Sequence, residues 1–297
     1  MSVPATVPSI SSNMKSKQRY TEVPETWEEL TEADWREVLK IRQLVAATDH
    51  QWTAEDVRIE TARAILQNRG IKTQPNNELY LMLLSKMQKS LTWLWQEHDG
   101  GLSLCYRSTV NLLPRVKHGE HIWIGPLSHG EDLLFGEFRQ AMIHLNAWET
   151  TQTEAPLAAL SGLLYRPEAT DEQKHEQQLR RQPYDWDAIG DNIKRGLKMQ
   201  PWQRWGIYAW FSYFCEYLTT GTFIIEGGEV CFEPLFDTTS GSKIGKNGGG
   251  TLAQIALTLA ESHVFGTIKD VDHTPLLTVM LKLLMDYEVL RKLKAKK

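Results

Sequence analysis

The residues most suggestive of chemistry lie in the glycine-rich segment GSKIGKNGGGT, which begins at Gly241. A phosphate-binding loop has the spacing G-x-x-x-x-G-K-[ST], so that backbone N–H groups and the lysine surround the phosphates. Here Gly245 follows Gly241 one residue too early, and Asn247 stands where Ser or Thr should follow Lys246. We therefore interpret residues 237–250 as a flexible Gly/Ser-rich linker.

A second candidate is a group of histidines and carboxylates, comprising His118, Glu120, His121, His129, Glu131 and Asp132. Imidazole and carboxylate groups are ligands of zinc. The H-x-x-H spacing does not match H-E-x-x-H, which places two imidazoles on one face of a helix. We interpret these histidines as surface-loop residues and predict no metal. A metal- or nucleotide-dependent hydrolase of a mobile element, using His118, His121, Glu131 or Asp132, remains the alternative.

Other reactive side chains lack a catalytic arrangement. Asp185, Asp187 and Asp191 could form a carboxylate pair, but acidic residues are also favoured at helix starts by the helix dipole. Ser161 occurs as L-S-G-L in an apolar stretch and not in a G-x-S-x-G elbow. We predict no catalytic residues and no cofactor, so the chain is not expected to be an enzyme.

Composition excludes several classes of protein. A net charge of -4 argues against a general nucleic-acid binder, and the four lysines of KLKAKK at the C-terminus suit a helix end. A nucleic-acid accessory factor is kept as the second alternative. Cys105, Cys215 and Cys231 form neither a disulfide framework nor a metal motif. No apolar run reaches the roughly 18 residues of a membrane span, so we predict a cytoplasmic protein without membrane contact.

Apolar periodicity predicts a mainly α fold, a multi-helix bundle with a small β-hairpin or short strands. Helices are expected near residues 34–47, 53–70, 78–96, 135–147, 156–165, 187–197 and 201–220. Short strands are expected within residues 102–127, and a hairpin is expected to turn at Gly227 and Gly228. The charged segment 168–183 is interpreted as a solvated surface. The aromatic helix from Pro201 is expected to form the centre of the main domain.

The predicted organisation has four parts. They are a disordered arm at residues 1–18, a main helical domain at 19–236, the linker at 237–250 and a C-terminal αα-hairpin at 251–297. The hairpin has more apolar surface than its two helices can cover for each other. We therefore expect it to bind a protein partner by a helix-in-groove contact. The candidate partner-binding residues are Val264, Phe265, Leu276, Leu277, Val279, Met280, Leu283 and Leu284.

The order of several segments resembles a group of uncharacterised proteins from Bacteroidetes prophages and related mobile elements. The segments are YTEVPETWEELTEADWREVLKI, NLLPR, IGPLSHGEDLLFGEFRQA, LSGLLYRP, the aromatic helix and LAESHVFGTIKDVDHTPLLTVMLKLL. The last segment is similar to one in tail-region proteins of such phages. The resemblance implies a tail-assembly chaperone or a minor tail-associated protein. Such a protein would cover apolar surface on a tape-measure or tail-tube subunit in the host cytoplasm, or remain in the virion.

Overall fold

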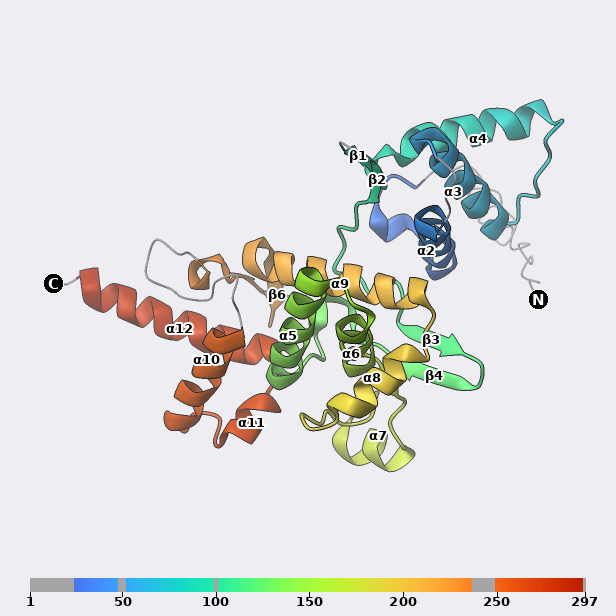
Figure 1. The fold of residues 1–297 in the computed structure, drawn as a ribbon. Helices are drawn as coiled ribbons and strands as arrows, with labels where there is room; N and C mark the ends of the chain where they lie inside the picture. The colour runs from blue at the N-terminus through green and yellow to red at the C-terminus, as the bar shows by residue number, and fades with distance from the viewer. Residues whose placement is uncertain (1–23, 48–51, 99–100, 237–248, 296–297) are drawn as a thin grey trace, which may run out of the picture. The chain divides into compact units, whose positions relative to one another are not determined.

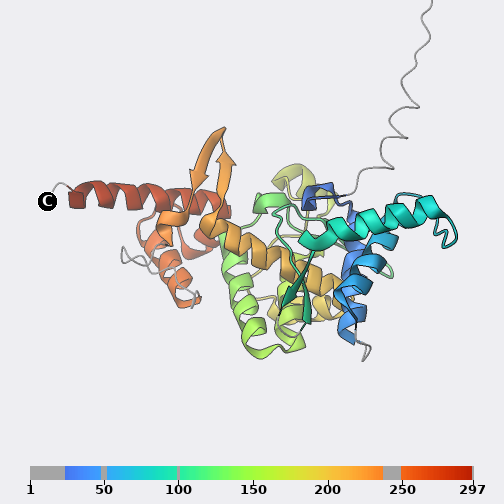
Figure 2. The ribbon, with the colours of Figure 1, turned by 90° about the horizontal axis from the view of Figure 1, so that it is seen from above.

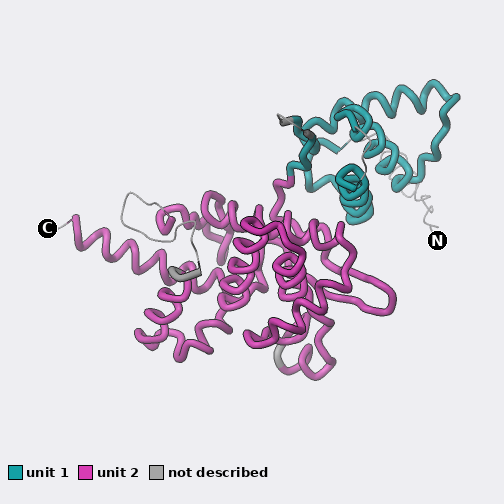
Figure 3. The backbone as a smooth tube through the Cα atoms, viewed as in Figure 1, with its two compact units in different colours: residues 1–105 teal, residues 106–297 magenta. Residues whose placement is uncertain are grey.

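The computed structural model describes residues 24–47, 52–98, 101–236 and 249–295. The chain divides into two compact units, residues 1–105 and residues 106–297 (Figure 3). Helices predominate in the described residues and the strands form small antiparallel sheets, so the predicted mainly α fold is confirmed. The predicted arm, residues 1–18, lies outside the described residues.

Unit 1 combines helices with one small hairpin (Figure 1). Its elements are η1 (Trp27–Glu29), α2 (Glu32–Ala47), α3 (Ala54–Asn68), α4 (Glu78–Ser90), η2 (Leu91–Trp93), β1 (Trp95–His98) and β2 (Gly101–Leu104). Thr31 and Asp34 exchange side chain to backbone hydrogen bonds at the start of α2, and Thr53 and Asp56 do the same for α3. Each pair supplies hydrogen-bond acceptors for two backbone N–H groups that have no acceptor within the helix.

The third predicted helix, residues 78–96, is shorter than expected. Helix α4 ends at Ser90, and Trp95 begins strand β1, which pairs with β2. Trp95 is buried and donates its indole N–H to Thr61 Oγ1 at 3.0 Å. A buried tryptophan needs a hydrogen-bond acceptor. This contact with α3 depends on a residue far away in the sequence, so the apolar pattern could not indicate it.

Unit 2 is larger and holds the remaining helices (Figures 1 and 2). Its strands are β3 (Arg115–His118), β4 (His121–Ile124), β5 (Arg166–Pro167), β6 (Thr222–Ile225) and β7 (Gly228–Cys231). Its helices are η3 (Ser128–Gly130), α5 (Phe135–Thr151), α6 (Glu154–Leu164), α7 (Asp171–Gln177), α8 (Ile189–Leu197), α9 (Pro201–Thr220), η4 (Glu233–Leu235), α10 (Gly249–Glu261), α11 (Ile268–Asp272) and α12 (Leu276–Ala295).

The aromatic helix α9 contributes large side chains to the core of unit 2. Trp210, Phe211 and Phe214 are buried, and the rings of Trp210 and Phe214 stack with centroids 5.7 Å apart. Phe138 of α5 meets Phe211 edge-on at 6.0 Å. The helix is not apolar on every buried side, since Arg204 is also buried. Aromatic packing therefore joins α9 to α5.

Helices α6 and α8 approach each other at two glycines. A Cβ atom added to Gly162 would lie 1.9 Å from the carbonyl oxygen of Asn192. One added to Gly196 would lie 1.9 Å from the carbonyl oxygen of Ala158. No side chain fits at either position, so glycine sets the distance between these two helices.

Strands β6 and β7 form the predicted hairpin, but the turn lies one residue earlier than expected. Ile225 pairs with Gly228, so the turn residues are Glu226 and Gly227. Their φ values are 51° and 80°. Positive φ at both central positions is what a type I′ turn requires. The predicted Gly227–Gly228 turn was therefore wrong by one position.

The C-terminal helices belong to unit 2 and pack against α5. Phe135 N–H donates to the carbonyl of Thr274 at 2.9 Å, and Leu276 N–H donates to the carbonyl of Leu133 at 2.8 Å. Arg139 of α5 forms a bidentate ion pair with Asp272 of α11, with Nη2–O distances of 2.8 and 2.9 Å.

The boundary between the two units lies at residues 105–106 and not at the expected linker, residues 237–250. The helices that follow this linker cover apolar surface of unit 2 and belong to it. Residues 237–248, most of the predicted linker, lie outside the described residues.

Candidate functional site

A buried ionic network lies between α5 and the chain that follows α6. The carboxylate of Glu137, which is fully buried, lies 2.7 Å from Arg166 Nη1 and 2.8 Å from Arg181 Nη1. The two guanidiniums also donate to the carbonyls of Leu163 and Leu164. Burial lowers the pKa of Arg166 to about 10, although Glu137 opposes this shift. These contacts link α5 to the segment that follows α6. Arg181 is buried, so the interpretation of residues 168–183 as a solvated surface is wrong at this position.

Asp132, one of the carboxylates proposed for a hydrolase, joins this network. It lies 3.2 Å from Arg180 Nη1 and 3.6 Å from Arg181 Nη2. It also accepts the backbone N–H of Leu127 at 2.7 Å. Its neighbour Glu131 is exposed. These contacts of Asp132 stabilise the fold, and none of them is with His118 or His121.

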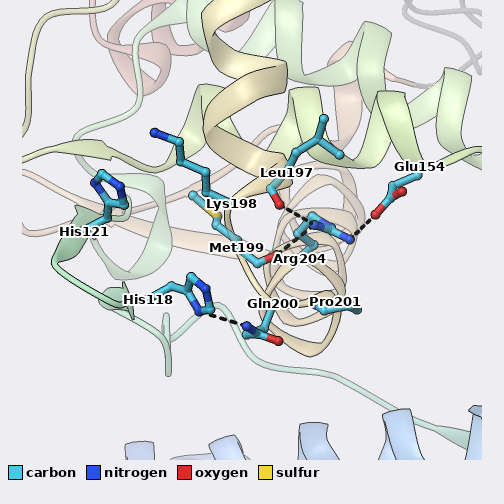
Figure 4. Close-up of a pocket in the computed structure, with 9 residues that line it drawn as sticks. All are labelled: His118, His121, Glu154, Leu197, Lys198, Met199, Gln200, Pro201 and Arg204. Atoms are coloured by element: carbon cyan, nitrogen blue, oxygen red, sulfur yellow. Dashed lines mark hydrogen bonds and ion pairs between the residues drawn. The ribbon is translucent and has the colours of Figure 1, made fainter.

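His118 and His121 line a surface pocket of about 480 Å³ with residues of α6, α8 and α9 (Figure 4). They are paired across the β3–β4 hairpin, and His118 Nδ1 lies 2.8 Å from Gln200 Nε2. His129 does not line this pocket and lies 2.7 Å from Thr109 Oγ1 through its Nδ1. Among the described residues, no three His, Cys, Asp or Glu side chains gather as a metal site requires.

Arg204 forms a buried wall of the same pocket (Figure 4). Its Nη1 donates to the carbonyls of Gly196 and Met199 at 3.2 and 2.8 Å, and its Nη2 pairs with Glu154. These carbonyls lie at the C-terminal end of α8, which a cation stabilises. Burial lowers the pKa of Arg204, and Glu154 opposes the shift. The guanidinium is thus engaged in helix capping, and we assign no reaction to this pocket.

The other side chains considered for catalysis also have structural contacts. Asp185 accepts the backbone N–H of Asp187 at 3.0 Å, and Asp191 forms an exposed ion pair on α8. Ser161 is buried and donates to a carbonyl of its own helix at 2.8 Å. None of these contacts forms a nucleophile–base pair.

The predicted partner-binding residues divide into buried and accessible ones. Leu276, Val279 and Met280 are buried within unit 2 and cannot meet a partner in this structure. The residues that are half-buried are Phe265, Leu277, Leu283 and Leu284. Val264 is exposed. The helix-in-groove hypothesis therefore loses its three central side chains, because they already cover this unit.

A different part of α12 carries exposed apolar side chains. Met285, Val289, Leu290 and Leu293, which we call the α12 stripe, are 64%, 56%, 57% and 57% exposed. Their spacing of i, i+4, i+5 and i+8 places them along one side of the helix. Beyond its buried first turns, α12 extends away from the other helices of unit 2 (Figures 1 and 2). The sequence contains this spacing, but apolar side chains occur on several sides of the helix, so the pattern does not indicate which of them face solvent.

No family model, curated protein or solved structure matches this chain. Within the described residues, no helix has the length and apolar character needed to cross a membrane.

Proposed function

We propose that the chain is a non-enzymatic assembly protein that binds a protein partner through the α12 stripe. The observation that supports this proposal is the exposure of the four stripe side chains on a helix whose first turns are anchored in unit 2. Burying a side chain of this size on a partner contributes about 1.5–3 kcal/mol relative to exposure. Several such side chains on one rigid helix form the anchor of a helix-in-groove contact.

The charges around the α12 stripe indicate the chemistry of its partner. Asp286 and Glu288 lie between Met285 and Val289, whereas Arg291, Lys292 and Lys294 lie beside Leu290 and Leu293. An apolar groove whose rim is acidic where it meets the C-terminal end of the stripe complements this arrangement, and such a rim would also increase the rate of association.

Several segments, in their order along the chain, resemble proteins of Bacteroidetes prophages. This resemblance is the reason for choosing a phage tape-measure or tail-tube subunit as the partner. On that basis the protein acts as a tail-assembly chaperone or minor tail-associated protein in the host cytoplasm or the virion.

The test is a direct binding measurement with the double variant Val289→Glu/Leu293→Glu. Two buried charges would replace two apolar contacts, so we expect affinity for the tail subunit to fall at least about a hundredfold, equivalent to ~2.7 kcal/mol. Ile224→Glu in β6 is the matched control, because Ile224 is also exposed, in the same unit and outside the stripe. Equal binding by the wild-type protein and the double variant would reject the stripe as the binding surface.

Point variants are preferable to removing residues 251–297. Deletion would also remove Leu252, Leu259, Val271 and Leu276, which belong to the core of unit 2. Loss of binding by such a truncated protein would then report on unfolding. The double variant changes exposed positions, so its unfolding temperature should stay close to that of the wild type.

A further inference from the structure

The exposed part of α12 carries opposite charges on the two sides of Val289. Asp286 and Glu288 precede this residue, and Arg291 and Lys292 follow it. All four charged side chains are exposed. A second copy of α12 that runs in the opposite direction brings the basic end of one helix to the acidic end of the other. A copy that runs in the same direction would bring like charges together, which is unfavourable.

The apolar residues of the α12 stripe are also arranged symmetrically about Val289. Met285 precedes it by four residues, and Leu293 follows it by four. When two antiparallel copies cross at Val289, this side chain meets its own copy, and each Met285 is level with Leu293 of the other helix. A two-fold axis through Val289 then makes both halves of the contact identical, as in an isologous dimer. The order of the stripe residues therefore fits a second copy of this chain.

One flank of the stripe carries Glu288 and Lys292. They are four residues apart, so both lie on the same side of α12. The two-fold axis brings this flank of one copy beside the same flank of the other. At a rise of 1.5 Å per residue, Glu288 of one copy is then only about 3 Å along the axis from Lys292 of the second copy, which a lysine side chain can span. This ion pair forms twice in the dimer.

The remaining charges of α12 do not oppose such a contact. On the other flank, Lys282 already forms an ion pair with Asp286 of the same helix. Arg291 and Lys294 are exposed, and the rotation of 100° per residue turns them away from the line of Met285, Val289 and Leu293. Pairing of two copies therefore covers apolar side chains without burying a charge that has no partner.

We propose that the α12 stripes of two copies pair in antiparallel orientation, centred on Val289, so that the free protein is a two-fold symmetric dimer. Each copy then covers the stripe of the other. The contact involves few side chains, so we expect a reversible dimer with a micromolar or weaker dissociation constant. Its regulatory role rests on the proposed function: the assembly partner displaces the second copy, and the binding surface stays covered until that partner is present.

The first test is sedimentation equilibrium of the full chain alone, at concentrations of roughly 1–500 µM. We expect the wild-type protein to form a reversible dimer. Val289→Glu places two like charges together at the two-fold axis, so the dissociation constant of the dimer should rise at least about tenfold. Ile224→Glu, at an exposed position of β6, adds the same charge outside the stripe and should leave the dimer unchanged.

The second test exchanges the charges of the flank. Glu288→Lys brings lysines together in the dimer, and Lys292→Glu brings carboxylates together, so each variant alone should dimerise at least about tenfold more weakly than the wild type. In an equal mixture of the two variants, every flank contact between copies joins opposite charges. Heterodimers should then form with nearly the wild-type affinity. Effects within one helix are the same alone and in the mixture, so recovery on mixing reports contact between copies.

A wild-type dimer that weakens in each charge variant and recovers in the mixture supports the proposal. A wild-type protein that stays monomeric over this range would overturn it, and so would a mixture that dimerises as weakly as its components. Binding of the tail subunit is measured separately. If the wild-type protein is monomeric but binds the subunit, only the pairing is rejected. If the dimer forms as expected but binds no subunit, only the proposed function is rejected, together with the regulatory role that rests on it.

Discussion

The substitution Glu137→Gln tests whether the buried ionic network is essential to unit 2. Glu137 has no exposed surface and lies within 2.8 Å of a guanidinium nitrogen of both Arg166 and Arg181. Glutamine keeps the size of the side chain and one acceptor oxygen. It removes the charge and places an NH₂ donor beside groups that can only donate.

The expected cost follows from leaving two buried guanidiniums without their shared carboxylate. Removing one partner of a buried ion pair typically destabilises a protein by about 3–5 kcal/mol. For a domain of about 150–250 residues, each kcal/mol lowers the unfolding temperature by roughly 2–4 °C. We therefore expect the transition of unit 2 to fall by roughly 6–20 °C.

The assay is differential scanning calorimetry at neutral pH, with circular dichroism confirming that the variant is folded at low temperature. Glu216→Gln in α9 is the control, because Glu216 is exposed and its side chain has no hydrogen bond or ion pair within the described residues. A transition in Glu137→Gln as high as that of the control would refute the reasoning. It would mean that the arginines are satisfied by backbone carbonyls alone.

Two further predictions concern packing and pH. Gly162→Ala should destabilise unit 2 by at least about 1–3 kcal/mol, because its Cβ would meet the Asn192 carbonyl; Gly190→Ala, with open space around it, should not. Chemical denaturation of both variants decides this, and equal stability would contradict the predicted clash. Burial lowers the pKa of His144 below 6.5, so its contribution to stability is present above pH 6.5 and is lost as pH falls through the folded-state pKa. Denaturation of His144→Gln across this range should show a shallower loss than the wild type, whereas parallel curves would contradict it.

Features set by neighbouring residues could be predicted from the sequence. Thr53 and Asp56 are three residues apart, which is the spacing of the capping box that begins α3. Pro201 at the first position of α9 is favoured because its missing N–H would have no helical partner there. The hairpin turn was located to within one residue, because two adjacent glycines make neighbouring turn positions equally acceptable.

Features set by distant residues could not be predicted. Arg166 and Arg181 lie 29 and 44 residues from Glu137, so no local pattern distinguishes them from solvated arginines. Arg181 occurs in a segment rich in charges of both signs, where an exposed helix or loop is the usual outcome. Likewise, apolar side chains occur on several sides of α12, so their pattern did not indicate that Leu276 would be covered by its own unit and Leu293 exposed.

The docking of the C-terminal helices on α5 constrains when unit 2 can fold. Arg139 leaves the ribosome 133 residues before Asp272, its bidentate partner. Until then, the surface of α5 that meets α11 stays uncovered, and the backbone groups of Leu133 and Phe135 lack their partners. Nascent unit 2 is therefore incomplete during most of its own synthesis, and segments with such delayed contacts are exposed to aggregation.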